Sequence, residues 1–167
     1  MDAIKTINVF YSSEDQKTFP SVGAVLLQLQ LLEATWTTSQ GDEIELKLHD
    51  TAAIEGFEVS PELVEQIVSN NETVLTLIAP NALLGRGMLT SAAWQQLLAA
   101  GKENKVFLLG VYCEKVCNAQ RMSTLLGGRN WFVTKIGLHL SSGDAINDEA
   151  ADVGDKLVKV LEKRFYG

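Results

Sequence analysis

Apolar residues recur along the chain with two periods, one typical of strands and one typical of helices. Residues 6–12 predict a first buried strand, because Ile7, Val9 and Phe10 are apolar. Apolar residues at helical spacing then predict a helix over about residues 19–36. The strict alternation of EIELKL, residues 43–48, predicts a half-buried strand towards an edge of a sheet.

The alternation of strand and helix patterns continues to the end of the chain. A helix is predicted from Ser60 as N-cap and Pro61 at the first helical position. ETVLTLIAP, apolar almost throughout, predicts a central parallel strand, and TSAAWQQLLAAGKEN a third helix. Two more strands are predicted in residues 105–112 and 131–140, and a last helix in residues 145–165. This order predicts an α/β fold with a parallel sheet and helices on both faces.

Composition and charge narrow the class of protein. A chain of 167 residues with 46% hydrophobic residues predicts a single domain, residues 1–167, with a real core. The formal net charge of −7 argues against nucleic-acid binding, because phosphate backbones repel an acidic surface. No apolar run approaches the roughly 18 residues that span a bilayer, and MDAIKTINVF does not resemble a signal peptide. We therefore expect a cytoplasmic protein that does not bind membranes.

Several common sites of small α/β domains are not predicted. Cys113 and Cys117 are the only cysteines, and their spacing favours two reduced thiols over a zinc site. The chain has neither a G-x-x-x-x-G-K-[ST] nor a G-x-G-x-x-G phosphate loop, and no G-x-S-x-G elbow for a serine hydrolase. A receiver domain needs an aspartate at the end of the third strand, which here reads LIAPNAL. We therefore expect no metal and no bound cofactor.

A succession of motifs resembles the Toll/interleukin-1 receptor (TIR) domain family. INVFYSSEDQ, residues 7–16, is similar to the family's F-[IV]-S-Y-[SA]-x-x-D pattern. IELKLHDTAAIEGFEVSPELVEQI resembles its second strand, glycine-containing loop and following helix. TVLTLIAPNAL, LTSAAWQQL and KVFLLGVYCEK resemble its third strand, its S-x-W helix and its fourth strand. The resemblance implies a TIR-like, flavodoxin-like three-layer sandwich around a five-stranded parallel sheet.

The resemblance also implies a catalytic residue that this chain lacks. Enzymatic TIR domains cleave the bond between nicotinamide and ribose in NAD, with a glutamate four residues after the tryptophan of the third helix. Trp94 matches that tryptophan, but position 98 is Leu98, which cannot ionise or accept a hydrogen bond. The next acidic residue, Glu103, lies nine positions beyond Trp94. The family's site is thus expected in a degenerate form, without a confident catalytic residue, at these positions: Tyr11, Ser12, Ser91, Trp94 and Leu98.

Two functions follow from the resemblance. The first is an interaction module that binds itself or another TIR domain, in bacterial signalling or defence. Its interaction loop is expected to include Asp50, Ile54, Glu55, Gly56, Phe57 and Val59. The second is an NAD-cleaving or nucleoside-transferring enzyme, with NAD as substrate, that draws its carboxylate from another position: Glu14, Asp15, Asp50 or Glu55.

A flavodoxin-like domain outside the TIR family is a third possibility. A flavin-binding protein would need a Ser/Thr-rich phosphate loop after the first strand. Glu14 and Asp15, expected in the loop before the first helix, would repel that phosphate.

Overall fold

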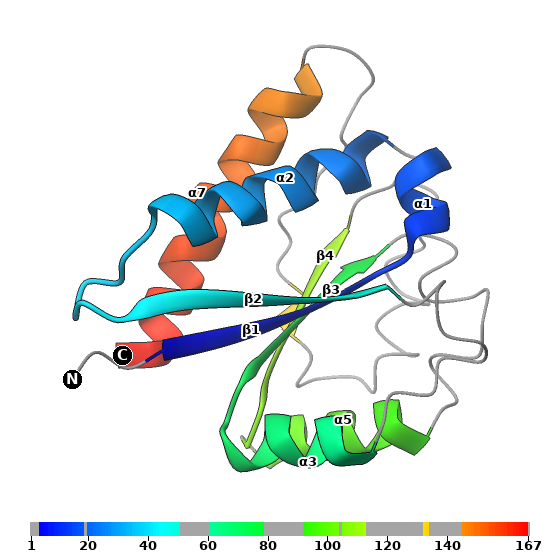
Figure 1. Cartoon of the computed structure of the whole chain (residues 1–167), viewed down its shortest axis with the longest axis vertical. Coiled ribbons are helices and arrows are strands. Elements are labelled where there is room, and N and C mark those ends of the chain that lie inside the picture. The colour runs from blue at the N-terminus through cyan, green and yellow to red at the C-terminus, as the bar shows by residue number, and fades with distance from the viewer. Residues whose placement is uncertain are drawn as a thin grey trace.

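The computed structural model of the chain describes residues 4–18, 20–50, 61–78, 92–103, 105–112, 132–133 and 145–166. Its helices and strands alternate along the sequence (Figure 1). In chain order they are β1 (Ile4–Tyr11), α1 (Ser13–Thr18), α2 (Pro20–Thr35), β2 (Glu43–Asp50), α3 (Pro61–Ser69), β3 (Thr73–Ile78), α5 (Ala92–Lys102), β4 (Phe107–Tyr112), β5 (Phe132–Val133) and α7 (Ala145–Tyr166).

The strands form one parallel sheet in the order β2-β1-β3-β4-β5. Within the described residues β2 lies at one edge of the sheet, as the alternating pattern of residues 43–48 predicts. The apolar strand β3 lies between β1 and β4, which confirms its expected central place. Helices α2 and α7 cover one face of the sheet, and α3 and α5 lie on the other (Figure 1). The expected α/β class with a parallel sheet is confirmed.

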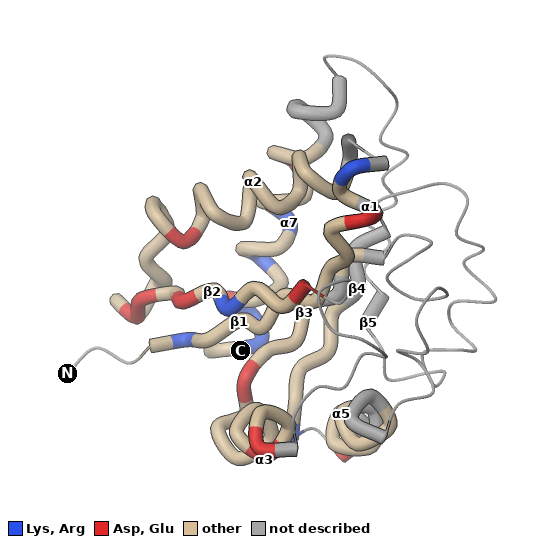
Figure 2. Tube along the Cα trace, turned by 45° about the vertical axis from the view of Figure 1, so that its right-hand side comes forward, with Lys and Arg blue, Asp and Glu red and all other residues tan. Residues whose placement is uncertain are grey.

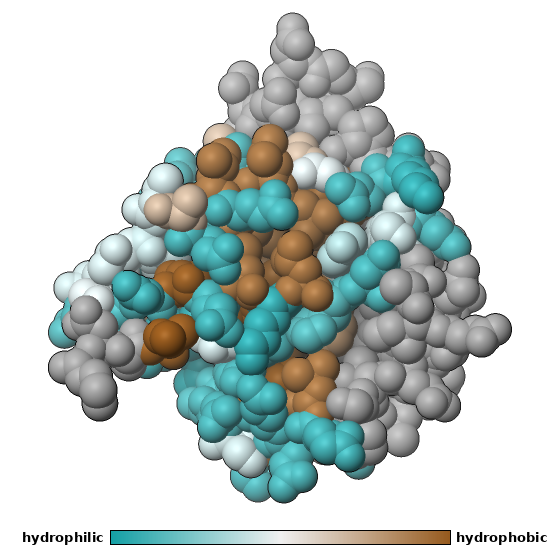
Figure 3. Space-filling view, viewed as in Figure 1, coloured by the Kyte–Doolittle hydropathy of each residue, from teal (hydrophilic) through white to brown (hydrophobic). Residues whose placement is uncertain are grey.

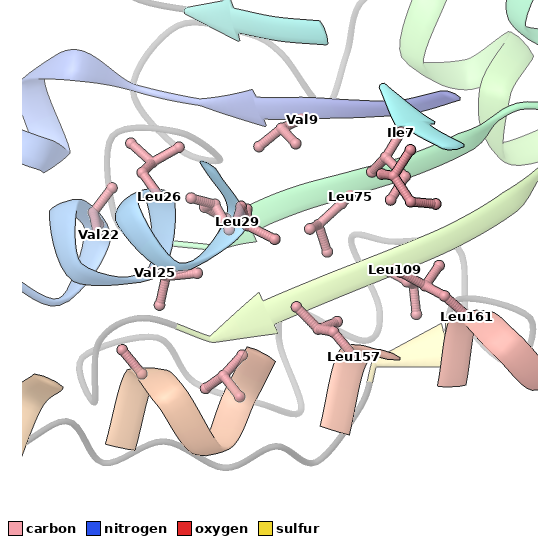
Figure 4. Packing of buried hydrophobic residues seen from close by; sticks show 14 residues of the cluster. Ile7, Val9, Val22, Val25, Leu26, Leu29, Leu75, Leu109, Leu157 and Leu161 are labelled. Atoms are coloured by element: carbon pink, nitrogen blue, oxygen red, sulfur yellow. The ribbon is translucent and has the colours of Figure 1, made fainter. Parts of the chain in front are cut away.

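The main core lies between the sheet and the helix pair α2 and α7. Alternate residues of β1, Ile7 and Val9, point to this face and meet apolar side chains of both helices (Figure 4). Residues in register with them on the neighbouring strands, such as Leu75 and Leu109, extend the same layer. Burying each leucine of this kind stabilises the fold by about 1.5–3 kcal/mol. The layer fixes the faces of β1: Asn8 and Phe10 must point to the opposite side.

The segment after β1 differs from the sequence prediction. Glu14 and Asp15, expected in a loop, belong to the short helix α1, which ends before α2 begins at Pro20. The prediction was wrong because SEDQKT has no apolar periodicity from which a helix could be read. A side chain from a different strand stabilises this helix, as described below.

Candidate functional site

The described part of the predicted site lies at the carboxyl edge of the sheet, where β1 and β2 end side by side. Tyr11 and Asp50 are the last residues of these strands and are paired in the parallel register. Ligands of parallel α/β sheets bind beyond this edge, next to the point where the strand order reverses. Here β1 lies between β2 and β3, so the chain reverses direction across the sheet beside Tyr11.

Asp50 caps helix α1 from the neighbouring strand. Its Oδ1 accepts a hydrogen bond of 2.9 Å from the backbone N–H of Ser13, the first residue of the helix. The Ser12 carbonyl accepts the first helical hydrogen bond, 3.0 Å from the N–H of Gln16. The N–H groups of a helix's first turn have no acceptors within the helix. A carboxylate there accepts such a hydrogen bond, and its negative charge also interacts favourably with the helix dipole. The sequence prediction placed Asp50 in the interaction loop, but it is the final residue of β2 and holds α1 in place.

Tyr11 and Ser12 are the residues at which β1 ends at this edge. Ser12, between β1 and α1, is only 2% exposed, so its side chain is part of the interior. Burial raises the pKa of the Tyr11 phenol, and the charge of Asp50 raises it further. Tyr11 therefore remains a neutral phenol at physiological pH, able to donate a hydrogen bond but not to act as a base.

The other predicted site residues lie on α5 or outside the described residues. The backbone places Trp94 and Leu98 in α5, one helical turn apart, as the resemblance implies. The helix, AAWQQLLAAGK, contains no carboxylate. Ser91 and the loop residues Ile54, Glu55, Gly56, Phe57 and Val59 lie outside the described residues. Of the alternative carboxylates, Glu14 and Asp15 belong to α1 and Asp50 to β2, close to the same edge.

A buried polar network beneath the sheet was not predicted from the sequence. Asn8, fully buried in β1, donates from Nδ2 to Glu72 Oε1 at 2.9 Å and to the Thr73 carbonyl at 3.4 Å. Asn70 donates to the second carboxylate oxygen of Glu72 at 3.3 Å. Glu72 is only 7% exposed, so little water can solvate its carboxylate. The amide donors of Asn8 and Asn70 take the place of that water. The available signal was a single polar residue, Asn8, between the apolar Ile7 and Val9.

His49 completes the network from β2. Its Nε2 lies 3.1 Å from Asn8 Oδ1, and its ring stacks on Phe10 with centroids 4.8 Å apart. Both donors of the Asn8 amide point at acceptors, so its oxygen faces the histidine, and Nε2 must carry the proton. Burial lowers the pKa of His49, Lys47 lowers it further, and Glu72 opposes them. His49 is therefore a neutral hydrogen-bond donor at physiological pH.

Comparison with known proteins identifies no relative of this chain. No protein-family model matches it, and neither a curated protein nor a solved structure does. Within the described residues, no three or more histidine, cysteine, aspartate or glutamate side chains gather where they could hold a metal ion. In the same part of the chain, none of the helices has the length and apolarity that crossing a membrane requires.

Proposed function

We propose that this chain is a TIR-like interaction module that self-associates, and that it does not cleave NAD. The strand order β2-β1-β3-β4-β5 supports a flavodoxin-like sandwich, because that order is typical of the class. Leu98 supports the absence of NAD cleavage, since α5 carries no carboxylate at any position. Together with the motif succession, these features favour a TIR-like module over an NAD hydrolase.

The observation that carries self-association is the apolar outer surface of α2. A helix on a sheet usually turns apolar residues inward and polar residues to solvent. Helix α2 instead carries Leu27, 53% exposed, and Leu31, 47% exposed, on its outer side, four residues apart. On the adjacent edge strand Leu48 is 40% exposed. Apolar side chains gather over α2 and β2 in the space-filling view (Figure 3). We call Leu27, Leu31 and Leu48 the α2–β2 surface.

A second copy of the chain would meet this surface through side chains rather than by adding a strand to β2. Edge strands invite pairing with another chain unless their backbone groups are covered. Glu33 of α2 accepts a hydrogen bond from the backbone N–H of Leu46, near the middle of β2. That N–H is therefore already paired, which disfavours continuous strand addition. The leucines of α2 remain available as the contact.

Analytical ultracentrifugation over a range of protein concentrations tests this proposal. We expect the mass of the wild-type protein to rise with concentration. In Leu31→Lys the dissociation constant should rise about tenfold or more, because burying a leucine contributes about 1.5–3 kcal/mol and each 1.4 kcal/mol is tenfold. Ala151→Lys, on an exposed position of α7, adds the same charge elsewhere and should associate like wild type.

Three results would contradict self-association through the α2–β2 surface. A wild-type protein that stays monomeric at every concentration would exclude self-association. Equal weakening by Leu31→Lys and Ala151→Lys would show that added charge, not the α2–β2 surface, controls association. If Leu31→Lys associates normally and Phe57→Ser does not, the surface is wrong and the predicted interaction loop carries the contact.

The second candidate function is an NAD-cleaving enzyme that uses another carboxylate. The observation that favours it is the placement of α1, with Glu14, and of Asp50 at one carboxyl edge. Asp50 is the weakest of the four alternatives, because its Oδ1 already accepts the Ser13 N–H. Nicotinamide release distinguishes this function from the first.

A further inference from the structure

The outer side of α2 carries apolar residues at a spacing that is the same in both directions along the helix. Ala24, Leu27, Leu31 and Ala34 follow one another at intervals of three, four and three residues. At 3.6 residues per turn these positions form one stripe, of the kind that two paired helices bury between them. Leu27, Leu31 and Ala34 are exposed, and Ala24 is partly buried. We call these four residues the α2 stripe.

The α2 stripe is also symmetric in side-chain size. Its two leucines lie at the centre, and an alanine follows three residues outwards from each. If two copies of α2 pack antiparallel about a two-fold axis, Leu27 of each copy faces Leu31 of the other. By the same symmetry, Ala24 faces Ala34, so large side chains meet at the centre and small ones at the ends. A two-fold contact requires a surface that is complementary to itself, and the α2 stripe meets that requirement.

Charge favours a second copy of this chain as the partner of the α2 stripe. The chain carries a net charge of −7, so two copies repel each other where acidic surfaces meet. Glu33 is the only charged residue of α2, and its carboxylate accepts a hydrogen bond from Leu46 on β2. Most of α2 is accordingly neither acidic nor basic (Figure 2). Gln30, exposed next to Leu31, has an amide with donors and an acceptor, which can pair with the same residue of a second copy.

We propose that two copies of this chain form a closed dimer in which their α2 helices pack antiparallel through the α2 stripe. The dimer rests on the proposed self-association and goes beyond it, because it fixes the stoichiometry and the residues that meet. Pairing occupies the stripe of both copies, so association stops at the dimer. The stripe is about 15 Å long. Short contacts of this kind belong to interfaces below about 1,200 Å², which are typical of transient complexes, so we expect micromolar or weaker affinity.

The test is a charge rescue between two variants that should each associate poorly alone. In Leu27→Glu and in Leu31→Lys, both central contacts of the dimer place a charge against a leucine, which should weaken self-association at least about tenfold. In a mixture of the two, the antiparallel dimer brings the new carboxylate and the new ammonium group together. The mixed pair should therefore bind at least about tenfold more tightly than either variant binds itself. Fluorescence-detected sedimentation with one variant labelled measures these dissociation constants.

Leu27→Glu mixed with Leu27→Lys is the matched control. It adds the same two charges to the same helix, but in the antiparallel dimer each new charge faces Leu31 of the other copy. General attraction between these variants should tighten binding no more than about twofold. Because Leu27 is 53% exposed and Leu31 47% exposed, the substitutions should leave the fold intact, which urea unfolding of each variant checks.

Sedimentation of the wild-type chain should reach a plateau at twice the monomer mass. The antiparallel dimer is wrong, with self-association intact, if neither mixture tightens, if both tighten equally, or if the wild-type mass grows beyond a dimer. Tightening in the control mixture alone would show that the helices pack in parallel. A wild-type chain that stays monomeric would instead contradict the proposed self-association, and the dimer with it.

Discussion

At the scale of single residues, His49 is the group whose surroundings most directly set its chemistry. Its ring lies against Phe10, and its Nε2–H is donated to the fully buried Asn8. Protonation of His49 would place a positive charge in a half-buried site. The Nε2–H of the neutral ring already has its acceptor there, the side-chain oxygen of Asn8. Burial, followed by Lys47, therefore lowers the pKa of His49 below its ordinary value.

A lowered histidine pKa makes folding stability depend on pH in a definite direction. The unfolded chain binds more protons than the folded chain between the two pKa values. His49 therefore contributes stability that is complete above about pH 6.5 and is lost as the pH falls through the folded pKa. In His49→Gln we expect a smaller loss of unfolding free energy between about pH 7.5 and about pH 5, measured by urea denaturation.

The second histidine of the chain provides the control. His139→Gln removes the chain's other imidazole, so the dependence of unfolding free energy on pH assigned to His49 should survive it. If the unfolding free energy of His49→Gln depends on pH as strongly as that of wild type, His49 is not the responsible group. The same conclusion follows if this dependence is lost in His139→Gln.

The network around His49 also shows what the sequence could not reveal. Asn8 is visible as a polar residue within an apolar strand, but its partner Glu72 lies 64 positions away. Only the pairing of β1 with β3, Ile7 opposite Thr73, brings the two together. Likewise Lys5 and Arg164 lie far apart in the sequence and line one pocket only because α7 packs beside β1.

At the scale of elements, α1 depends on a contact from outside itself. Six residues are too few to form a stable helix alone, and SEDQKT has no apolar face. Asp50, at the end of β2, supplies the missing partner for the Ser13 N–H. The elements β2, β3 and α2 could be predicted, because β2 alternates, β3 is a nearly continuous apolar run and α2 buries apolar residues at helical spacing. Helix α1 could not, because its stabilising contact is tertiary.

Removing the Asp50 carboxylate should loosen α1 selectively. Asp50→Ala leaves the Ser13 N–H unpaired, and we expect a loss of about 1 kcal/mol of unfolding free energy. Amide hydrogen exchange should accelerate first in Ser13–Thr18. Asp50→Asn keeps an acceptor oxygen and should lose less than Asp50→Ala. Unchanged exchange of α1 in Asp50→Ala would contradict the assigned role.

The elements also explain why the α2–β2 surface was not predicted. The pattern of α2 shows apolar residues on every side, from the buried Val25 and Leu29 to the exposed Leu27 and Leu31. Periodicity alone does not tell which side faces the sheet. The position of β2 at an edge, and of α7 beside α2, decides that the leucines remain exposed.

At the scale of the whole molecule, the described features occupy separate regions. Tyr11 and Asp50 lie at the carboxyl edge of the sheet, and a polar pocket lined by residues such as Lys5, Asn71 and Arg164 lies at the amino edge. The apolar α2–β2 surface lies along one side of the sheet (Figure 3). The α/β class with a parallel sheet follows from the sequence pattern, whereas the strand order is seen in the structure. The positions of these three regions depend on how the elements pack in three dimensions, which a local sequence pattern does not show.

The central claim is that this chain acts by association and not by cleaving NAD. Its most direct test is chromatographic detection of free nicotinamide after incubating NAD with the concentrated protein, with and without a crowding agent, because enzymatic TIR domains need to assemble. We predict no nicotinamide above the protein-free control, even where ultracentrifugation shows an assembled protein. Nicotinamide release that is abolished by replacing one of Glu14, Asp15, Asp50 or Glu55 would contradict the claim and identify the catalytic carboxylate.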